Sequence, residues 1–364
     1  MRNVSFVVTA LAMASLTQVH AQTSTTQIYG SLSTGLNYRT NQTSGNVYDL
    51  SNSQLSSSLL GFRGNEDLGG GLTAGFRLES GISSDTGAVG GTVAGNLKFF
   101  NRQAFVGLGL ASVGTVTLGR QFHAGVDRIV QSLDVYNAAG TSVHSTPLAL
   151  HGVNRFVGND SRADNAIKVR LNGPNGITAA ASYAFGEDTN SKSYSVDLAQ
   201  VTGSYTVGVY ALRYLSPNLV AGTGARPDYR ALGLGGNVQM GWIQPYVHIM
   251  HTRQAAATVT GVRTTNQIAL IGVRVPIAAW VLKAAYTHDK GTNLNNVQGR
   301  DGTKTTLVTS AEFYLSKRTS IYGALMHSKF TDGYKLDTLN IAAMARDPKA
   351  SSTSVYSVGV RHDF

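Results

Sequence analysis

The sequence of 364 residues contains no cysteine, and proline and tryptophan are rare, at 7 and 2 residues. Without cysteine the chain cannot form a disulfide framework, a thiolate metal site or a thiol nucleophile. Charged residues make up only 14% of the chain, against about 25% in typical soluble proteins. Glycine and tyrosine are abundant instead, at 41 and 16 residues, so the composition favours strands and turns.

Long hydrophobic runs are also missing, because no window beyond residue 21 offers the ~20 consecutive apolar residues of a membrane-spanning helix. The first residues differ from the rest: Arg2 is followed by a short apolar stretch over 4–16, and Ala21 ends a small-residue site. This pattern predicts a signal peptide over 1–21, cleaved after Ala21. A short buried helix is the alternative, but the polar stretch 22–27 follows at once.

The formal charge of the whole chain is +10. Removal of 1–21 takes away Arg2 and leaves 29 basic against 20 acidic residues, a charge of +9. A basic balance fits nucleic-acid binding, an anionic membrane surface or a cavity that attracts anions. Lysine and arginine are scattered, with no run of five, so we expect no nucleic-acid partner.

The hydrophobic pattern has a period of two residues. Over 28–38, Ile28, Leu32 and Leu36 share one face while small polar residues occupy the other, as in a strand with one apolar side. The same pattern recurs in segments of roughly ten residues, the length of a tilted membrane strand: 72–78, 177–185, 205–213, 242–252, 267–275, 280–288, 305–315, 321–329 and 355–364.

These segments predict an all-β fold, a transmembrane antiparallel β-barrel that occupies residues 22–364. Strands of a soluble sandwich are usually shorter, about five or six residues, and a sheet in lipid must close because lipid cannot satisfy a free edge. Weakly patterned stretches at 39–54, 83–96, 121–160, 289–303 and 331–353 are expected to be the longer loops. The longest of these, 121–160, exceeds an ordinary connection and is expected to have a functional role.

Several motifs resemble the general diffusion porins of Gram-negative outer membranes, in the branch typical of β-proteobacteria. The longest is LLGFRGNEDLGGGL at 59–72, and the others are NRQAFVGL at 101–108, TLGRQ at 117–121, YLSKRT at 314–319 and VGVRHDF at 358–364. The resemblance implies sixteen strands, a homotrimer with one pore per subunit, and a third loop, here 121–160, folded inward to narrow the channel.

The resemblance also implies location and partners. The protein is expected in the outer membrane of a Gram-negative bacterium, among its lipids and lipopolysaccharide, passing small hydrophilic solutes and ions without a cofactor. The terminal aromatic Phe364 matches the signal that the outer-membrane assembly machinery reads in this family. A last lipid-facing strand with an interfacial aromatic is an interpretation that can hold alongside it.

Residues that line the narrowest part of a pore decide which ions pass. Strand alternation turns Arg63, Arg77 and Glu79 inward, because their large apolar neighbours are expected to face lipid. If Phe105 also faces lipid, the odd spacing between the two residues places Arg102 in the lumen.

Family porins set an arginine cluster on the wall against acids on the inward loop. Arg102 and Arg162 match positions of that cluster, whereas Leu59 stands where another arginine is usual, and Asp127 and Asp134 are acids of the loop. The predicted constriction therefore consists of Arg63, Arg77, Glu79, Arg102, Arg162, Asp127 and Asp134. The charge of the mature chain and these arginines predict a mild preference for anions.

Two other functions stay open at this point. An outer-membrane barrel enzyme of the lipase or protease type needs a nucleophile, a base and an orienting group together, and no Gly-x-Ser-x-Gly motif supports one. A ligand-specific channel would differ from a general porin only in the geometry of its constriction. The nine histidines are scattered, so we predict no metal site.

Overall fold

The computed structural model describes residues 24–53, 55–93, 96–136, 161–187, 192–215, 228–256 and 261–364. The predicted signal peptide, 1–21, and the second part of the predicted constriction loop, 137–160, lie outside these residues. Strands dominate the described chain. They are β1 Ser24–Gln42, β2 Gly45–Asn52, β3 Leu59–Gly69, β4 Leu72–Gly81, β5 Gly91–Val93, β6 Asn96–Lys98, β7 Gln103–Leu110, β8 Gly114–Phe122, β9 Arg162–Asn172, β10 Ile177–Ala184, β11 Ser193–Val201, β12 Tyr205–Leu215, β13 Asp228–Val238, β14 Gln244–Gln254, β15 Thr264–Ile277, β16 Trp280–Thr292, β17 Gly302–Tyr314, β18 Thr319–Phe330 and β19 Ser352–Asp363.

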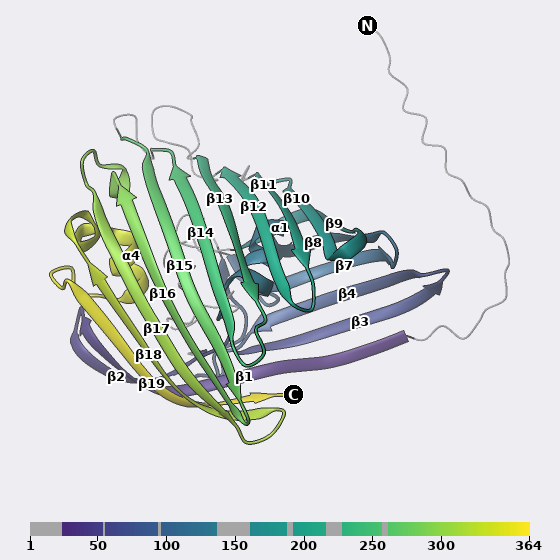
Figure 1. Cartoon of the computed structure of the whole chain (residues 1–364), viewed down its shortest axis with the longest axis horizontal. Coiled ribbons are helices and arrows are strands. Elements are labelled where there is room, and N and C mark those ends of the chain that lie inside the picture. The colour runs from purple at the N-terminus through teal and green to yellow at the C-terminus, as the bar shows by residue number, and fades with distance from the viewer. Residues whose placement is uncertain are drawn as a thin grey trace, which may run out of the picture.

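The strands form a closed antiparallel barrel (Figure 1). Each strand from β7 to β19 pairs with the next along the chain, β3 pairs with β4, and β4 with β7. β19 closes the ring on β1, from Ser31 opposite Asp363 to Arg39 opposite Val355. β2 and β3 follow one another along the other edge of β1 and share one place in the ring. The predicted barrel of sixteen strands is therefore confirmed.

The outer face of the barrel is apolar. Leu36, Val106, Val247 and Val358 are each more than half exposed, and they alternate with residues that point to the interior. The faces predicted for 28–38 are confirmed, because Ile28, Leu32 and Leu36 are all exposed. Lipid is the solvent that such a surface requires.

Connections differ in length between the two ends of the barrel. At one end β3 and β4 are joined by 70–71, β7 and β8 by 111–113, and β11 and β12 by 202–204. The first of these turns needs glycine, because Gly69, Gly70 and Gly71 all have positive φ angles, a conformation that residues with a Cβ avoid. We call this the short-turn end, and the end that carries the longer connections the long-loop end.

Two segments fold against the inner wall. The first, 123–136, contains α1 Ala124–Arg128 and a π-helical turn, Ile129–Leu133. The second contains a 3-10 turn, Asp332–Leu336, and α4 Thr338–Met344. Elsewhere in the described residues, short helical turns occur at Pro174–Gly176 and Leu294–Asn296. No helix within the described ranges is long and apolar enough to span a membrane.

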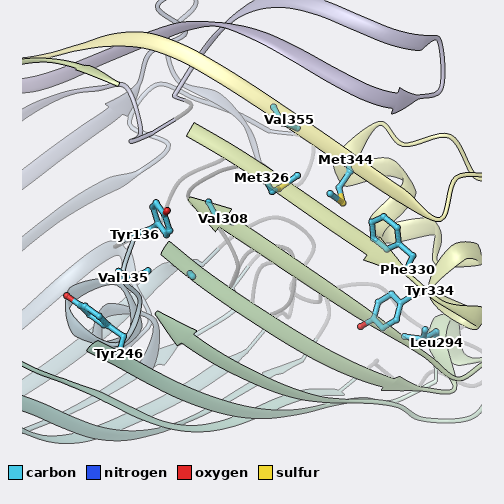
Figure 2. Close-up of a cluster of buried hydrophobic side chains, with 11 residues drawn as sticks. Val135, Tyr136, Tyr246, Leu294, Val308, Met326, Phe330, Tyr334, Met344 and Val355 are labelled. Carbon is cyan, nitrogen blue, oxygen red and sulfur yellow. The ribbon is translucent and has the colours of Figure 1, made fainter. Parts of the chain in front are cut away.

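The core of the molecule lies inside the barrel, between these segments and the wall. Figure 2 shows one of its clusters, in which Val135 and Tyr136 lie at one end and Phe330, Tyr334 and Met344 at the other. The sequence predicted an inward fold only for 121–160, and that of 332–344 was missed. The segment 332–344 contacts wall residues that are far from it in the sequence. For example, Asn266 Nδ2 of β15 donates to Tyr334 Oη at 2.7 Å.

Candidate pore constriction

Three predicted residues meet on the inner wall formed by β1, β3, β4 and β7. Arg63 lies opposite Arg77 in the register of β3 and β4, and its guanidinium stacks over the Tyr29 ring at 4.9 Å. Glu79 is buried and accepts hydrogen bonds from Tyr29 Oη and Gln103 Nε2, each at 2.6 Å. These neutral donors hold the carboxylate against the wall, whereas the Arg77 guanidinium stays 38% exposed and 4.0 Å away.

The outward orientation expected for Phe105 is wrong. Phe105 lies opposite Arg77 in the register of β4 and β7, and directly opposite residues of a sheet share a face, so Phe105 points inward. The phase argument that placed Arg102 in the lumen fails with it. Arg102 precedes β7, its backbone N–H donates to the Glu79 carbonyl at 3.1 Å, and its side chain is half-buried. Its role in the constriction stays a prediction based on the resemblance.

Arg162 lies on the inner side of the wall. It is opposite Phe122 in the register of β8 and β9, and its guanidinium lies 4.2 Å from the centre of the Phe122 ring. Phe122 belongs to the apolar cluster inside the barrel. The Phe122 ring holds the Arg162 guanidinium close to the end of β8, where the first inward segment, 123–136, begins. We call 123–136 the inward segment.

Asp127 and Asp134, the two acids predicted for the constriction, make contacts with β9 and within the first inward segment. Asp127 pairs with Lys168 and with Arg170, the latter at 3.4 Å, so two cations of β9 already compensate its charge. Asp134 has no exposed surface, and its Oδ1 accepts the Tyr136 backbone N–H at 3.1 Å. Asp127 therefore anchors the segment to the wall, and Asp134 supports the backbone of the segment.

The main anchor was not predicted from the sequence. Arg128 of α1 lies 2.9 Å from Oδ1 of Asp197 on β11, with side chains that are 3% and 0% exposed, and it also donates to Thr178 Oγ1 at 2.7 Å. Backbone N–H groups add to the attachment, because Ala124 donates to Ser182 Oγ at 3.0 Å. A buried pair of this kind fixes the position of the segment more strongly than surface charges can.

Apolar contacts complete the attachment of the inward segment. Its apolar side chains pack against inward-facing residues of β12 to β15, in a cluster of Phe122, Val126, Ile129, Leu133, Tyr210, Leu212, Tyr229, Ala231, Met250 and Ile268. The sequence held a signal for this contact, because the strand over 205–213 carries large apolar residues on both faces. A strand whose faces contact only water and lipid would carry large apolar residues on its lipid face alone.

His123 is buried at the start of the segment. Burial lowers the pKa of His123 to about 4, and the nearby cations of Lys168 and Arg120 act in the same direction. Its Nδ1 lies 3.4 Å from Ser193 Oγ, and its Nε2 has no hydrogen-bond partner within the described chain. The folded protein therefore requires a neutral imidazole at this position.

We predict that acid weakens the docking of 123–136. The pKa of His123 is about 4 in the folded protein and about 6.5 in an unfolded chain, so the docked segment has its full stability above pH 6.5. As the pH falls from 6.5 toward 4, the docked state loses roughly 3 kcal/mol of stability in total. Current noise in single-channel records should rise over this window. His123→Asn should flatten the dependence, and an identical response in that variant would contradict the assignment.

The inner walls carry more positive than negative charge around the segment. Among the described residues, the cations there are Arg63, Arg77, Arg128, Arg162, Lys168 and Arg170, and the carboxylates are Glu79, Asp127, Asp134 and Asp197. Arg120, which the sequence left unassigned, instead pairs with Asp164 at 2.7 Å. Among the residues that the structure describes, no group of three histidines or acids could hold a metal ion.

Comparisons with known proteins agree with this geometry. The family model described as "Gram-negative porin" matches residues 7–333. The chain is 27% identical to outer membrane porin protein 32 of Delftia acidovorans over 98% of both chains. It is 30% identical to an outer membrane porin protein of Bordetella pertussis over 38% of this chain and 33% of that protein.

Solved porins share the fold. The anion-selective porin from Comamonas acidovorans aligns with a TM-score of 0.76 at 24% identity, covering 94% of this chain and all of that one. The trimer form of OmpT from Vibrio cholerae aligns at 0.69 with 14% identity, over 94% and 99% of the two chains. With a closed sixteen-stranded barrel and a family match over most of its length, the chain belongs to the Gram-negative porins, outer-membrane channels that are not enzymes.

Proposed function

We propose that this porin is a general diffusion pore with a mild preference for anions. The observation that carries the proposal is the excess of cations on the inner wall near the inward segment: Arg63 and Arg77 on β3 and β4, and Lys168 and Arg170 on β9, where the last two share one carboxylate, Asp127. Cations in a narrow lumen with low-dielectric walls raise the local concentration of anions. Asp134 is buried within the inward segment, where its Oδ1 accepts the Tyr136 backbone N–H at 3.1 Å, so it is not exposed on the wall beside these cations.

The double variant Arg63→Gln, Arg77→Gln should bring the reversal potential of the pore in a KCl gradient closer to zero. The two guanidiniums face the lumen directly opposite one another, so their removal takes two positive charges from the permeation path. Planar-bilayer recording measures the shift.

The outer face offers a matched control. Arg213 and Arg230 are also directly opposite one another, on β12 and β13, but they bind Asp228 and lie on the series that faces away from the lumen. Arg213→Gln, Arg230→Gln should leave the reversal potential unchanged. Equal shifts of the reversal potential in both double variants would contradict a local effect of Arg63 and Arg77. The selectivity would then depend on the net charge of the protein alone.

Trimer formation and export are parts of the same proposal. A solved relative has a trimer form, and an unheated gel of the folded protein should show a species of three times the monomer mass. The apolar start of the chain and Ala21 support cleavage of residues 1–21, which the mass of protein purified from outer membranes would test.

A repeated pattern on the outer face supports contact with lipopolysaccharide. Toward the long-loop end, β14, β16 and β18 each carry an outward apolar residue, then a histidine, then a cation, at alternate positions: Ile249, His251 and Arg253; Tyr286, His288 and Lys290; Leu325, His327 and Lys329. Acyl chains fit the apolar level, and phosphate groups fit the level of the cations. Arg253→Gln, Lys290→Gln should reduce the lipopolysaccharide that copurifies with the protein.

A further inference from the structure

A cavity lies inside the barrel on the short-turn side of the inward segment. It has a volume of about 510 Å³ and is bounded by the segment, by the inner faces of β13 to β16 and by the turn 202–204. Its lining includes Arg128, Gln131, Asn237, Gln244, Arg274 and Lys283. These residues are separate from the seven that were predicted for the constriction.

The cavity is lined by three cations and by no acid within the described chain. Arg128 is compensated, because it binds Asp197 at 2.9 Å. Arg274 and Lys283 are opposite one another in the register of β15 and β16, which brings their Cβ atoms to within about 5.5 Å. Like charges at directly opposite positions repel one another and destabilise a sheet.

The acids nearest to this pair have other partners. Glu312 is held by Arg361 at 3.4 Å and by Ser320 Oγ at 2.6 Å, and Asp134 Oδ1 accepts the Tyr136 backbone N–H at 3.1 Å. Neither Arg274 nor Lys283 forms a side-chain hydrogen bond or an ion pair with any residue that the structure describes. The ammonium of Lys283 lies 5.5 Å from the centre of the Tyr136 ring.

We infer that this cavity binds a small solute that carries carboxylate or phosphate groups, a step that rests on the proposed anion preference. Arg274 and Lys283 supply two adjacent cations. The free-energy cost of their mutual repulsion falls when an anion lies between them. The amides of Asn237 and Gln244, joined by a hydrogen bond of 3.0 Å, give the cavity a polar wall. The volume far exceeds the roughly 30 Å³ of a water molecule, so an organic anion of several carbons fits.

The test is calorimetric titration of the folded wild-type protein with citrate and, separately, with inorganic phosphate. We expect binding of at least one of them, with affinity at least tenfold weaker in Arg274→Gln, Lys283→Gln. This variant removes a repulsion, and its shift in mobility on an unheated gel verifies that the barrel is folded. Binding of citrate alone, phosphate alone or both assigns the ligand to carboxylates, phosphates or their shared chemistry.

Lys317→Gln, Arg318→Gln is the matched control, because both residues are exposed in the turn between β17 and β18 at the same end of the barrel. It should bind as the wild type does. No binding to the wild type, or equal binding to the wild type and to Arg274→Gln, Lys283→Gln, overturns the inference. KCl conductance in the same preparation would then show that the proposed pore still stands. Anion binding without any KCl conductance would instead overturn the proposed function and keep the site.

Discussion

Arg128→Met is expected to loosen the inward segment, raising both the mean conductance and the current noise of single channels. Arg128 and Asp197 are buried, with a guanidinium nitrogen 2.9 Å from the carboxylate. The substitution leaves Asp197 as an uncompensated charge in the wall, and breaking a buried pair in this way costs about 3–5 kcal/mol. The segment can relieve that cost by moving away and letting water reach the carboxylate.

Two variants separate this effect from a general loss of stability. Arg128→Met with Asp197→Leu removes both charges, and replacement of a whole buried pair by apolar residues is often close to neutral, so conductance should return toward the wild-type level. Arg213→Met breaks an exposed pair with Asp228, a kind that contributes about 0–1 kcal/mol, and should have little effect. Wild-type conductance in Arg128→Met would contradict the role of this pair as an anchor.

Arg346→Met is expected to release the second inward segment. Arg346 has no exposed surface, and its guanidinium donates to the carbonyls of Asp347, Ala350, Tyr334 and Lys335 at 2.7–3.3 Å. It also stacks on the Phe330 ring at 4.4 Å. Loss of these charge-assisted bonds should cost about 3–5 kcal/mol of local stability, because the buried carbonyls lose their donors.

Limited trypsin digestion of the folded barrel measures this release. Cleavage after Lys335 should become much faster in Arg346→Met, because the helical turn 332–336 loses two of its carbonyl contacts. Lys349→Gln, which removes an exposed charge from the same loop, should leave the rate at Lys335 unchanged. A cleavage rate in Arg346→Met equal to that of the wild type would show that other contacts hold the segment.

The barrel could be predicted because its outer face is a local signal. Lipid requires apolar side chains at every second position, so Ile28, Leu32 and Leu36 reveal both the strand and its orientation. The same logic assigned Arg63 and Arg77 to one face of the wall, and the two residues lie directly opposite one another in the register of β3 and β4. It failed at Phe105, because an aromatic residue can also line the inner wall, and alternation alone does not say which face is which.

The inner contacts could not be predicted because they join residues far apart in the chain. Arg128 and Asp197 are 69 positions apart, and Asn266 and Tyr334 are 68 apart. The sequence showed the charges but not their partners, so Asp127 and Asp134 were predicted to be open acids of the constriction. The cationic cavity was missed for the same reason, since Arg274 and Lys283 become neighbours only through the hairpin of β15 and β16.

Single-channel recording of the refolded protein, residues 22–364, under a KCl gradient tests the central proposal most directly. We expect stepwise, ohmic conductance and a reversal potential whose sign shows that chloride permeates more readily than potassium, because Arg63, Arg77 and the cations of β9 outnumber the carboxylates beside them. A reversal potential of the opposite sign would contradict the anion preference. A folded barrel that gives no conductance at all would contradict the pore.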